Sequence, residues 1–258
     1  MKNLIYGILF LIISTTLFAQ EAQLDSLLAL GDKYYSEFNN KAALEIYQKA
    51  DKLFPDNWQV LWRISRAYID IGEHLDENIE NFEDEQLKMY KMALDYADRA
   101  VKLAPNEAMP YVRRAIANGR IALFKGVFSV ASIVDAVRDD CRKAIELGNG
   151  GNIVQSLAHY VLARTHARVS QKWAPARAVI GLGWADLDSA LVHYEKAIKL
   201  RPGFIMYYLD YAKALIREDE YEKAREMLNK ALASKKQDED DHIRLAEVKK
   251  LLDEIKDE

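Results

Sequence analysis

The chain has 258 residues, with 36 Lys or Arg against 40 Asp or Glu, a formal net charge of −4. Half of the residues are apolar, and only five prolines and eleven glycines occur, a composition that favours helices throughout and leaves ample material for a core. The acidic balance argues against nucleic acid as a partner, and a single cysteine, Cys141, excludes an internal disulfide. We expect Cys141 to be a small buried hydrophobe.

The first nineteen residues have the order of a secretory signal peptide. Lys2 supplies the positive charge, an apolar stretch runs from Leu4 to Ile13, and Ala19 offers a small residue for cleavage. The alternative is an uncleaved anchor, but a membrane span needs about 20 apolar residues, and hydroxyl residues dilute this stretch after Ile13. We therefore expect an exported protein, periplasmic or else secreted. Nothing later in the sequence is apolar enough to span a bilayer, so we expect no integral span after cleavage.

From Leu24 onward the chain carries a repeating pattern. An apolar stripe of a first helix is followed by small residues where two helices of a hairpin approach closely, and a proline ends the second helix. The residues that fit are Leu27, Leu30, Gly31, Tyr34, Ala43, Tyr47, Ala50 and Pro55. This pattern resembles the 34-residue tetratricopeptide repeat (TPR).

The unit recurs along the rest of the chain. We place repeats at about 24–57, 58–107, 108–151, 152–204 and 205–238, with a polar-faced capping helix at 239–258. The second, third and fourth repeats are interrupted by insertions. The resulting prediction is an all-α fold, a right-handed superhelical TPR solenoid of about five helix hairpins that forms a single domain over residues 20–258.

A narrower resemblance rests on longer segments. NWQVLWRISRAYIDIGE, KMALDYADRAVKLAPNEA, the LFKG stretch and the tryptophan-containing insertion before the last helix of repeat four resemble the regulator-of-microtubule-dynamics branch of TPR proteins. The resemblance implies this architecture and a general adaptor role. It does not imply a role on microtubules, because a chain with this signal is expected to be an exported bacterial relative.

The insertions differ in chemistry. Residues 73–85 are acidic, with seven acidic and no basic residues, and are expected to form a solvated loop or a helix extension; they lack the pattern of a calcium loop. Residues 123–133 are apolar and are expected to pack on the array, with contact to a partner or membrane as the alternative. Residues 171–184 carry two tryptophans, which we expect to be packed with their N–H groups bonded.

First helices line the concave surface of TPR arrays, so their outward positions predict a binding groove. The candidate residues are Tyr35, Trp62, Arg63, Arg66, Arg113, Arg120, Arg164, Lys213 and Arg217. Arginine grips carboxylates with a planar fork, so we expect a groove for a protein or peptide partner, with an acidic segment or a C-terminal carboxylate as the specific hypothesis. The alternative is that these arginines pair with carboxylates of neighbouring helices.

Repeat four allows two registers. With Leu162 and Ala163 at the packing positions, Arg164 and Arg168 face the groove and His159 is packed; with Leu157 in that place, His159 faces the groove instead. We prefer the first register.

No nucleotide loop, catalytic motif or zinc-binding cysteine pair is present in the sequence, so we expect no enzyme, no cofactor and no metal site. Two histidines of repeat four, His159 and His166, could share a helix face but would make a poor metal site alone. The predicted function is a non-catalytic interaction scaffold of the cell envelope. The alternative is a soluble ligand-binding accessory of a transport system.

Overall fold

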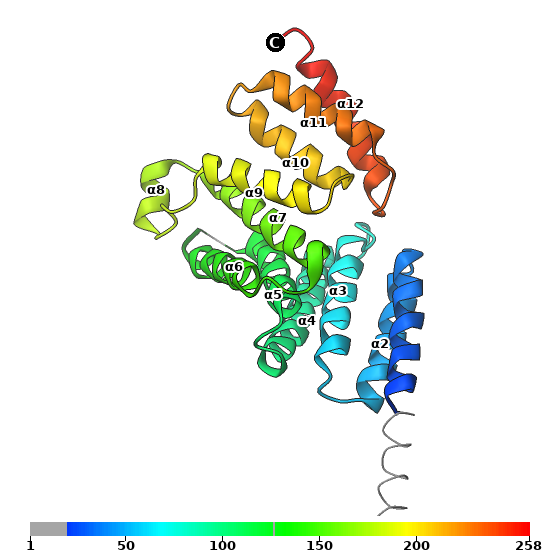
Figure 1. Ribbon diagram of the computed structural model, residues 1–258. Coiled ribbons are helices and arrows are strands. Elements are labelled where there is room, and N and C mark those ends of the chain that lie inside the picture. Colours follow the sequence, from blue (N-terminus) through cyan, green and yellow to red (C-terminus); the bar gives the residue numbers. More distant parts are fainter. Residues whose placement is uncertain (1–19, 126) are drawn as a thin grey trace, which may run out of the picture. The chain divides into compact units, whose positions relative to one another are not determined.

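The computed structural model describes residues 20–125 and 127–258, without the side chains of 127–129 (Figure 1). The predicted signal peptide, residues 1–19, lies outside these residues. Within them the secondary structure is helical and no strand occurs. The chain divides into two compact units, residues 1–103 and 104–258.

Unit 1 contains two helix hairpins. Its helices are the helix over residues 20–36, α2 (Asn40–Leu53), α3 (Trp58–Glu73) and α4 (Phe82–Leu103). Side-chain caps define two of the starts: Asn39 accepts a hydrogen bond from Ala42 N at 3.2 Å, and Asn57 accepts one from Gln59 N at 2.9 Å. These caps set the first residues of α2, which is the second helix of repeat one, and of α3, which is the first helix of repeat two.

The small residues of the repeat lie where the helices of unit 1 approach closely. Ala43 and Ala50 have no exposed surface, and the Tyr47 ring covers Gly31 so closely that a Cβ atom there would overlap it. Tyr90 of α4 lies against Gly72 of α3 in the same way. The predicted hairpin packing of the first two repeats is confirmed.

Unit 2 contains three further hairpins and a closing helix. The hairpins are α5 (Ala108–Ile121) with α6 (Val127–Leu147), α7 (Gly151–Ser170) with α9 (Leu187–Leu200), and α10 (Ile205–Ile216) with α11 (Tyr221–Ala233). A short 3-10 turn, Ala122–Phe124, precedes α6, and α8 (Ala174–Val179) lies in the insertion before α9. The all-α repeat fold that the sequence predicts is therefore present in each unit.

Tyrosines fill the core of unit 2. Tyr160 stacks on Tyr207 with ring centroids 4.6 Å apart, and Tyr194 lies 5.8 Å from Tyr211. Each of these four side chains is at most 4 % exposed. Aromatic pairs at such distances contribute about 0.5–1.5 kcal/mol beyond their buried area. This core holds α7, α9 and α10 in fixed positions.

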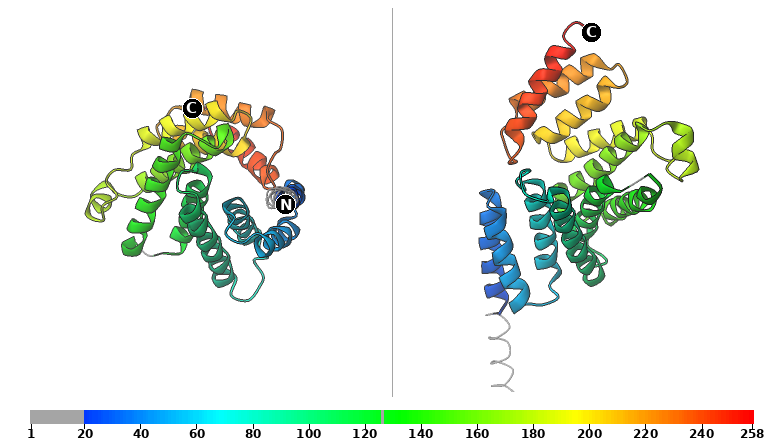
Figure 2. Two further views of the ribbon diagram at one scale, coloured as in Figure 1. Left: turned by 60° about the horizontal axis from the view of Figure 1, so that its bottom comes forward. Right: turned by 180° about the vertical axis from the view of Figure 1, so that it is seen from behind.

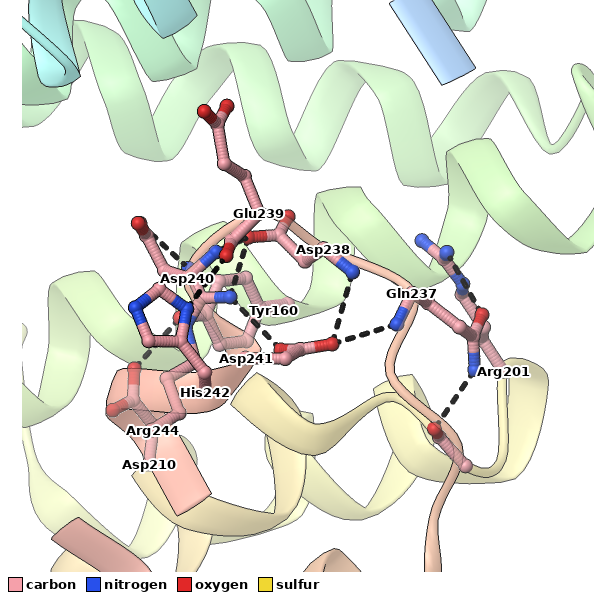
Figure 3. Close-up of polar contacts among 11 residues, drawn as sticks. Tyr160, Arg201, Asp210, Gln237, Asp238, Glu239, Asp240, Asp241, His242 and Arg244 are labelled. Carbon is pink, nitrogen blue, oxygen red and sulfur yellow. Dashed lines mark hydrogen bonds and ion pairs between the residues drawn. The ribbon is translucent and has the colours of Figure 1, made fainter. Parts of the chain in front are cut away.

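The last helix, α12 (Asp241–Glu254), begins at a buried carboxylate. Asp241 accepts hydrogen bonds from the backbone N–H groups of Gln237 at 2.8 Å and Asp238 at 2.9 Å, and Arg244 Nη1 donates to its other oxygen at 3.0 Å (Figure 3). Val248 and Ile255 are buried, while most other side chains of the helix are half-buried or exposed. The expected polar-faced capping helix is thus present at the end of unit 2.

The three insertions adopt different structures. Residues 73–85 form a turn-rich connection that ends in the first turn of α4, and the end of the 123–133 segment becomes the first turns of α6. Residues 171–184 form α8 and its flanking turns, which stand at the edge of unit 2 away from α12 (Figures 1 and 2).

The expectation that both tryptophans of this insertion pack was wrong for one of them. Trp184 is half-buried and its Nε1 donates to Asp135 Oδ1 at 2.9 Å, but Trp173 is 75 % exposed. Trp173 precedes the short helix α8, where no neighbouring helix covers its ring.

Candidate functional site

The predicted groove residues of unit 1 form one cluster around Asp32. Arg63 Nε lies 3.0 Å from both Asp32 oxygens, and its Nη2 donates to Oδ2 at 2.8 Å. Arg66 Nη2 donates to Oδ1 at 2.9 Å, and the Tyr47 hydroxyl donates to the same oxygen at 2.6 Å. Although burial alone would raise it, the hydrogen bonds from Arg63 and Tyr47 lower the pKa of Asp32 below its ordinary value.

Aromatic rings hold the same two arginines from the sides. The Arg66 guanidinium lies 3.5 Å from the ring centroid of Tyr35 and 5.0 Å from that of Trp62, and Arg63 lies 4.3 Å from the Trp62 ring. The structure therefore brings together all four candidates of unit 1, but it uses Arg63 and Arg66 to bind a carboxylate of the same unit. These two arginines thus follow the alternative in which arginines pair with carboxylates of neighbouring helices.

A pocket of about 180 Å³ opens on unit 2 between α7, α9 and α10. Its lining residues are Arg164, Ala167, Arg168, Gln171, Tyr194, Asp210, Lys213, Ala214 and Arg217. Four cationic side chains thus face one carboxylate, and buried alanines leave the space between them open. Three of the predicted groove residues, Arg164, Lys213 and Arg217, meet here.

Asp210 is the carboxylate in the wall of this pocket. It accepts a hydrogen bond from the Tyr160 hydroxyl at 2.7 Å (Figure 3), and Arg164 Nε lies 3.5 Å from the same oxygen. Lys213 Nζ is 3.8 Å from the other oxygen and makes a closer ion pair, at 2.7 Å, with Glu247 of α12. Arg164 and Lys213 are therefore both engaged by carboxylates of unit 2.

Arg217, at the end of α10, is held by oxygen atoms of α7. Its Nη1 donates to the carbonyl of Ala167 at 2.8 Å, and its Nη2 donates to Ser170 Oγ at 3.2 Å. These are the last turns of α7, where carbonyl groups have no partner in the helix. The contacts fix the guanidinium without neutralising its charge.

Arg168 differs from the other three cations. Its side chain makes no hydrogen bond or ion pair with any residue in the described part of the chain, and it remains exposed at the pocket. Partial burial, together with the charges of Arg164 and Arg120, lowers the pKa of Arg168 below its ordinary value. Arg120 of α5 thus contributes to the positive potential of this region without lining the pocket.

Tyr194 is a buried lining residue with an uncommitted polar group. It is 2 % exposed, and none of the described residues donates to or accepts from its hydroxyl. Burial raises the pKa of Tyr194, so the hydroxyl keeps its proton and remains a donor. Tyr194 is not among the predicted groove residues, and no local signal in the sequence shows that its hydroxyl reaches a pocket.

The structure adopts the first of the two registers of repeat four. Leu162 and Ala163 are buried, His159 is buried, and Arg164 and Arg168 line the pocket. The ninth candidate, Arg113, is half-buried on α5 and does not line the pocket.

Three histidines of unit 2 lie together on α7 and α9. His159 Nδ1 is 2.8 Å from His193 Nδ1, and the rings of His166 and His193 are 6.1 Å apart. Burial lowers the pKa of His159 and of His193 to about 4. In the part of the chain that the structure describes, no group of three or more His, Cys, Asp or Glu side chains is arranged to hold a metal ion.

No helix in the described part of the chain combines the length and the apolar character that crossing a bilayer requires.

Comparison with known proteins gives a match over nearly the whole described chain. Residues 24–256 match the family described as Regulator of microtubule dynamics protein 1-3. The rat protein named Regulator of microtubule dynamics protein 3 is 26 % identical over 203 residues, which cover 76 % of this chain and 41 % of that protein. The chain thus spans about two fifths of the length of this relative.

Solved structures show the same fold at low sequence identity. A TPR protein of Thermus thermophilus, TTC0263, superposes with a TM-score of 0.63 at 16 % identity, over 87 % of this chain and 98 % of that one. The Pseudomonas aeruginosa protein PilF gives a TM-score of 0.54 at 14 % identity, over 91 % and 86 % of the two chains. These likenesses concern the fold alone.

Proposed function

The chain belongs to the family of Regulator of microtubule dynamics protein 1-3, and from that premise we propose that it is a non-catalytic interaction scaffold that binds an acidic segment of a partner protein. One observation carries the proposal. At the pocket of unit 2, four cationic side chains face a single carboxylate in the wall. Such a surplus attracts anionic groups and accelerates their association.

The form of the pocket supports a protein segment over an enclosed small molecule. Arg168, Arg217 and Gln171 are exposed at the pocket, so an extended chain can reach it from solvent. Insertion 171–184 would be the natural lid for an enclosed ligand, but apart from Gln171 it does not line the pocket. These features favour the scaffold over the ligand-binding accessory of a transport system.

The pocket of unit 2 also supports binding better than the Asp32 cluster of unit 1. In that cluster Arg63 and Arg66 already contact a carboxylate at 2.8 and 2.9 Å. An acidic partner would have to compete with Asp32 there, whereas at the pocket Arg168 makes no ion pair that a partner would have to break.

The proposal also includes a place of action outside the cytoplasm. Its support is the order of charge, apolar stretch and small residue in the first nineteen residues. N-terminal sequencing of the protein recovered from the cell envelope tests this part, and an intact Met1 on the envelope protein would contradict cleavage.

The binding function is tested with short labelled peptides of equal length that are acidic, neutral or basic. Fluorescence anisotropy should show that the mature protein prefers the acidic peptide by at least about tenfold, and that this preference shrinks as salt rises. The double variant Arg168→Glu/Arg217→Glu should abolish the preference.

A matched control changes two exposed lysines of unit 2 away from the pocket. Lys199→Glu/Lys249→Glu alters the net charge of the protein by the same amount. If both double variants weaken binding equally, the effect is a general one of charge and the pocket is not the site. Equal binding of all three peptides by the unchanged protein would refute the function itself.

A further inference from the structure

We propose that one carboxylate group of the partner binds between the guanidinium of Arg168 and the hydroxyl of Tyr194, an inference that rests on the proposed function. It identifies the point of the pocket where the anion is recognised and the chemical group that is recognised there. Two sources could present the group, an acidic side chain or the free C-terminus of the partner, and both supply the same pair of oxygen atoms.

Three of the four cations at the pocket already have partners within unit 2. Arg217 donates to the Ala167 carbonyl and to Ser170, and Lys213 is paired with Glu247 at 2.7 Å. Arg164 lies against Asp210, with its Nε 3.5 Å from the nearer oxygen. These three cations shape and charge the pocket, but each has a contact within unit 2 that a ligand would have to share.

Arg168, Tyr194 and the exposed amide of Gln171 remain, and of these Arg168 carries a positive charge and Tyr194 is held in place by burial. The Arg168 side chain has no hydrogen-bond or ion-pair partner in the described residues, and the Tyr194 hydroxyl has none either although Tyr194 is 2 % exposed. The hydroxyl is not among the fully buried side-chain atoms without a partner, so solvent reaches it at the pocket. A ligand oxygen at this point would replace water as the acceptor of its hydrogen bond.

Two donor groups match the two oxygens of one carboxylate. The planar guanidinium of Arg168 can grip one or both oxygens, and the neutral Tyr194 hydroxyl can donate to one of them. Because burial raises the pKa of the phenol, it stays protonated and does not repel the anion.

The surrounding charges also attract an anion. Four cations lie near two carboxylates, Asp210 and Glu247, which leaves a net charge of +2.

The unliganded pocket places like charges close together. Arg164 and Arg168 are four residues apart on α7, a spacing at which two like charges destabilise a helix. The charges of Arg164 and Arg120 lower the pKa of Arg168, after the larger effect of burial. A bound carboxylate would relieve this repulsion, so occupancy should stabilise unit 2.

The test uses the full mature protein and three versions of one neutral peptide. The first has one internal Glu and an amidated end, the second has Gln in its place and a free C-terminal carboxylate, and the third has Gln and an amidated end. We expect the third to bind most weakly. Preference for the first identifies a side-chain source, and preference for the second identifies a C-terminal source.

Two variants then locate the contact. Tyr194→Phe should weaken the preferred carboxylate peptide by about tenfold, as expected for a hydrogen bond to a charged group, and Arg168→Met by at least as much. Both should bind the third peptide as the unchanged protein does. Tyr221→Phe and Lys199→Met serve as matched controls; the first removes an exposed hydroxyl of α11 that donates to Asp219 in the preceding turn.

Thermal unfolding without peptide separates loss of a contact from loss of the fold. Because the Tyr194 hydroxyl has no partner in the unliganded pocket, Tyr194→Phe should leave the melting temperature unchanged or raise it.

The proposed function and this inference fail in distinguishable ways. If carboxylate peptides bind the unchanged protein, and Tyr194→Phe and Arg168→Met bind them equally well, the inference is wrong while the proposed function stands. If the unchanged protein binds all three peptides equally, and also does not prefer the highly acidic peptide described above, both are wrong.

Discussion

We expect the Asp32 carboxylate to stabilise unit 1, and the variant Asp32→Asn tests this expectation. The change keeps the shape of the side chain but removes the charge that faces Arg63 and Arg66, whose side chains are only 16 % and 12 % exposed. Removing one partner of a fully buried ion pair costs about 3–5 kcal/mol. Because the Asp32 side chain is itself 39 % exposed, solvent screens part of that cost, and we expect a loss of about 2 kcal/mol.

The assay is urea unfolding of the mature protein with hydrogen exchange of the α3 amides. With a slope of about 2–3 kcal/mol per molar urea, the expected loss lowers the midpoint for unit 1 by about 0.7–1 M. Asp25→Asn is the matched control, because Asp25 lies on the same helix, is exposed and makes no contact that the structure records. Its midpoint should not move.

The same variant decides the role of the two arginines. If Asp32→Asn leaves the midpoint unchanged and binds an acidic peptide more tightly than the unchanged protein does, Arg63 and Arg66 are ligand groups and the reasoning is refuted. If the Asp32→Asn variant is destabilised and does not bind the peptide more tightly, Asp32 is the carboxylate that Arg63 and Arg66 bind. The role of the two arginines is then structural.

Three further predictions concern other parts of the chain. In the absence of ligand, Arg168→Gln should leave the free energy of unfolding of unit 2 unchanged or raise it by up to about 0.5 kcal/mol, because it removes a like charge four residues from Arg164. A clear decrease of that free energy in chemical unfolding would contradict this prediction. Burial lowers the pKa of His159 and His193 to about 4, below the value of about 6.5 in the unfolded chain. Between these two pH values the unfolded chain binds more protons than the folded one, so the melting temperature should fall as the pH decreases from 6.5 to 4. A melting temperature that stays constant over this range would be evidence against buried neutral histidines. Gly31→Ala should destabilise unit 1 by about 1–3 kcal/mol in urea unfolding, because the new Cβ overlaps the Tyr47 ring, and an unchanged midpoint would show that the ring moves aside freely.

Much of the fold was predictable because the repeat is a local pattern with a direct physical meaning. Gly31, Ala43 and Ala50 are small in the sequence because helices approach closely at those positions, and the structure shows this contact. The preferred register of repeat four was predictable for a related reason, since Leu162 and Ala163 continue the same apolar spacing.

The candidate site was predictable only in part. Three of the predicted groove residues, Arg164, Lys213 and Arg217, line one pocket, and helix periodicity indicates such a shared surface because residues three and four apart share a helix face. It could not show that Asp32, which the same periodicity also directs outward, binds Arg63 and Arg66. Nor could it show that Trp173 is exposed while Trp184 packs, since both lie in one insertion of irregular composition.

The sequence by itself determined the helical repeat and the surplus of arginine, because spacing and composition are properties of the chain alone. Only the tertiary structure decided which arginines remain available. That outcome depends on the distance between side chains from different helices. Arg63 lies 2.8 Å from a carboxylate oxygen that is 31 residues earlier in the chain. Arg168 makes no ion pair with a carboxylate in the described residues and lines the same pocket as Tyr194. Pairing between helices, rather than the presence of arginine, therefore separates a structural cluster from a binding site.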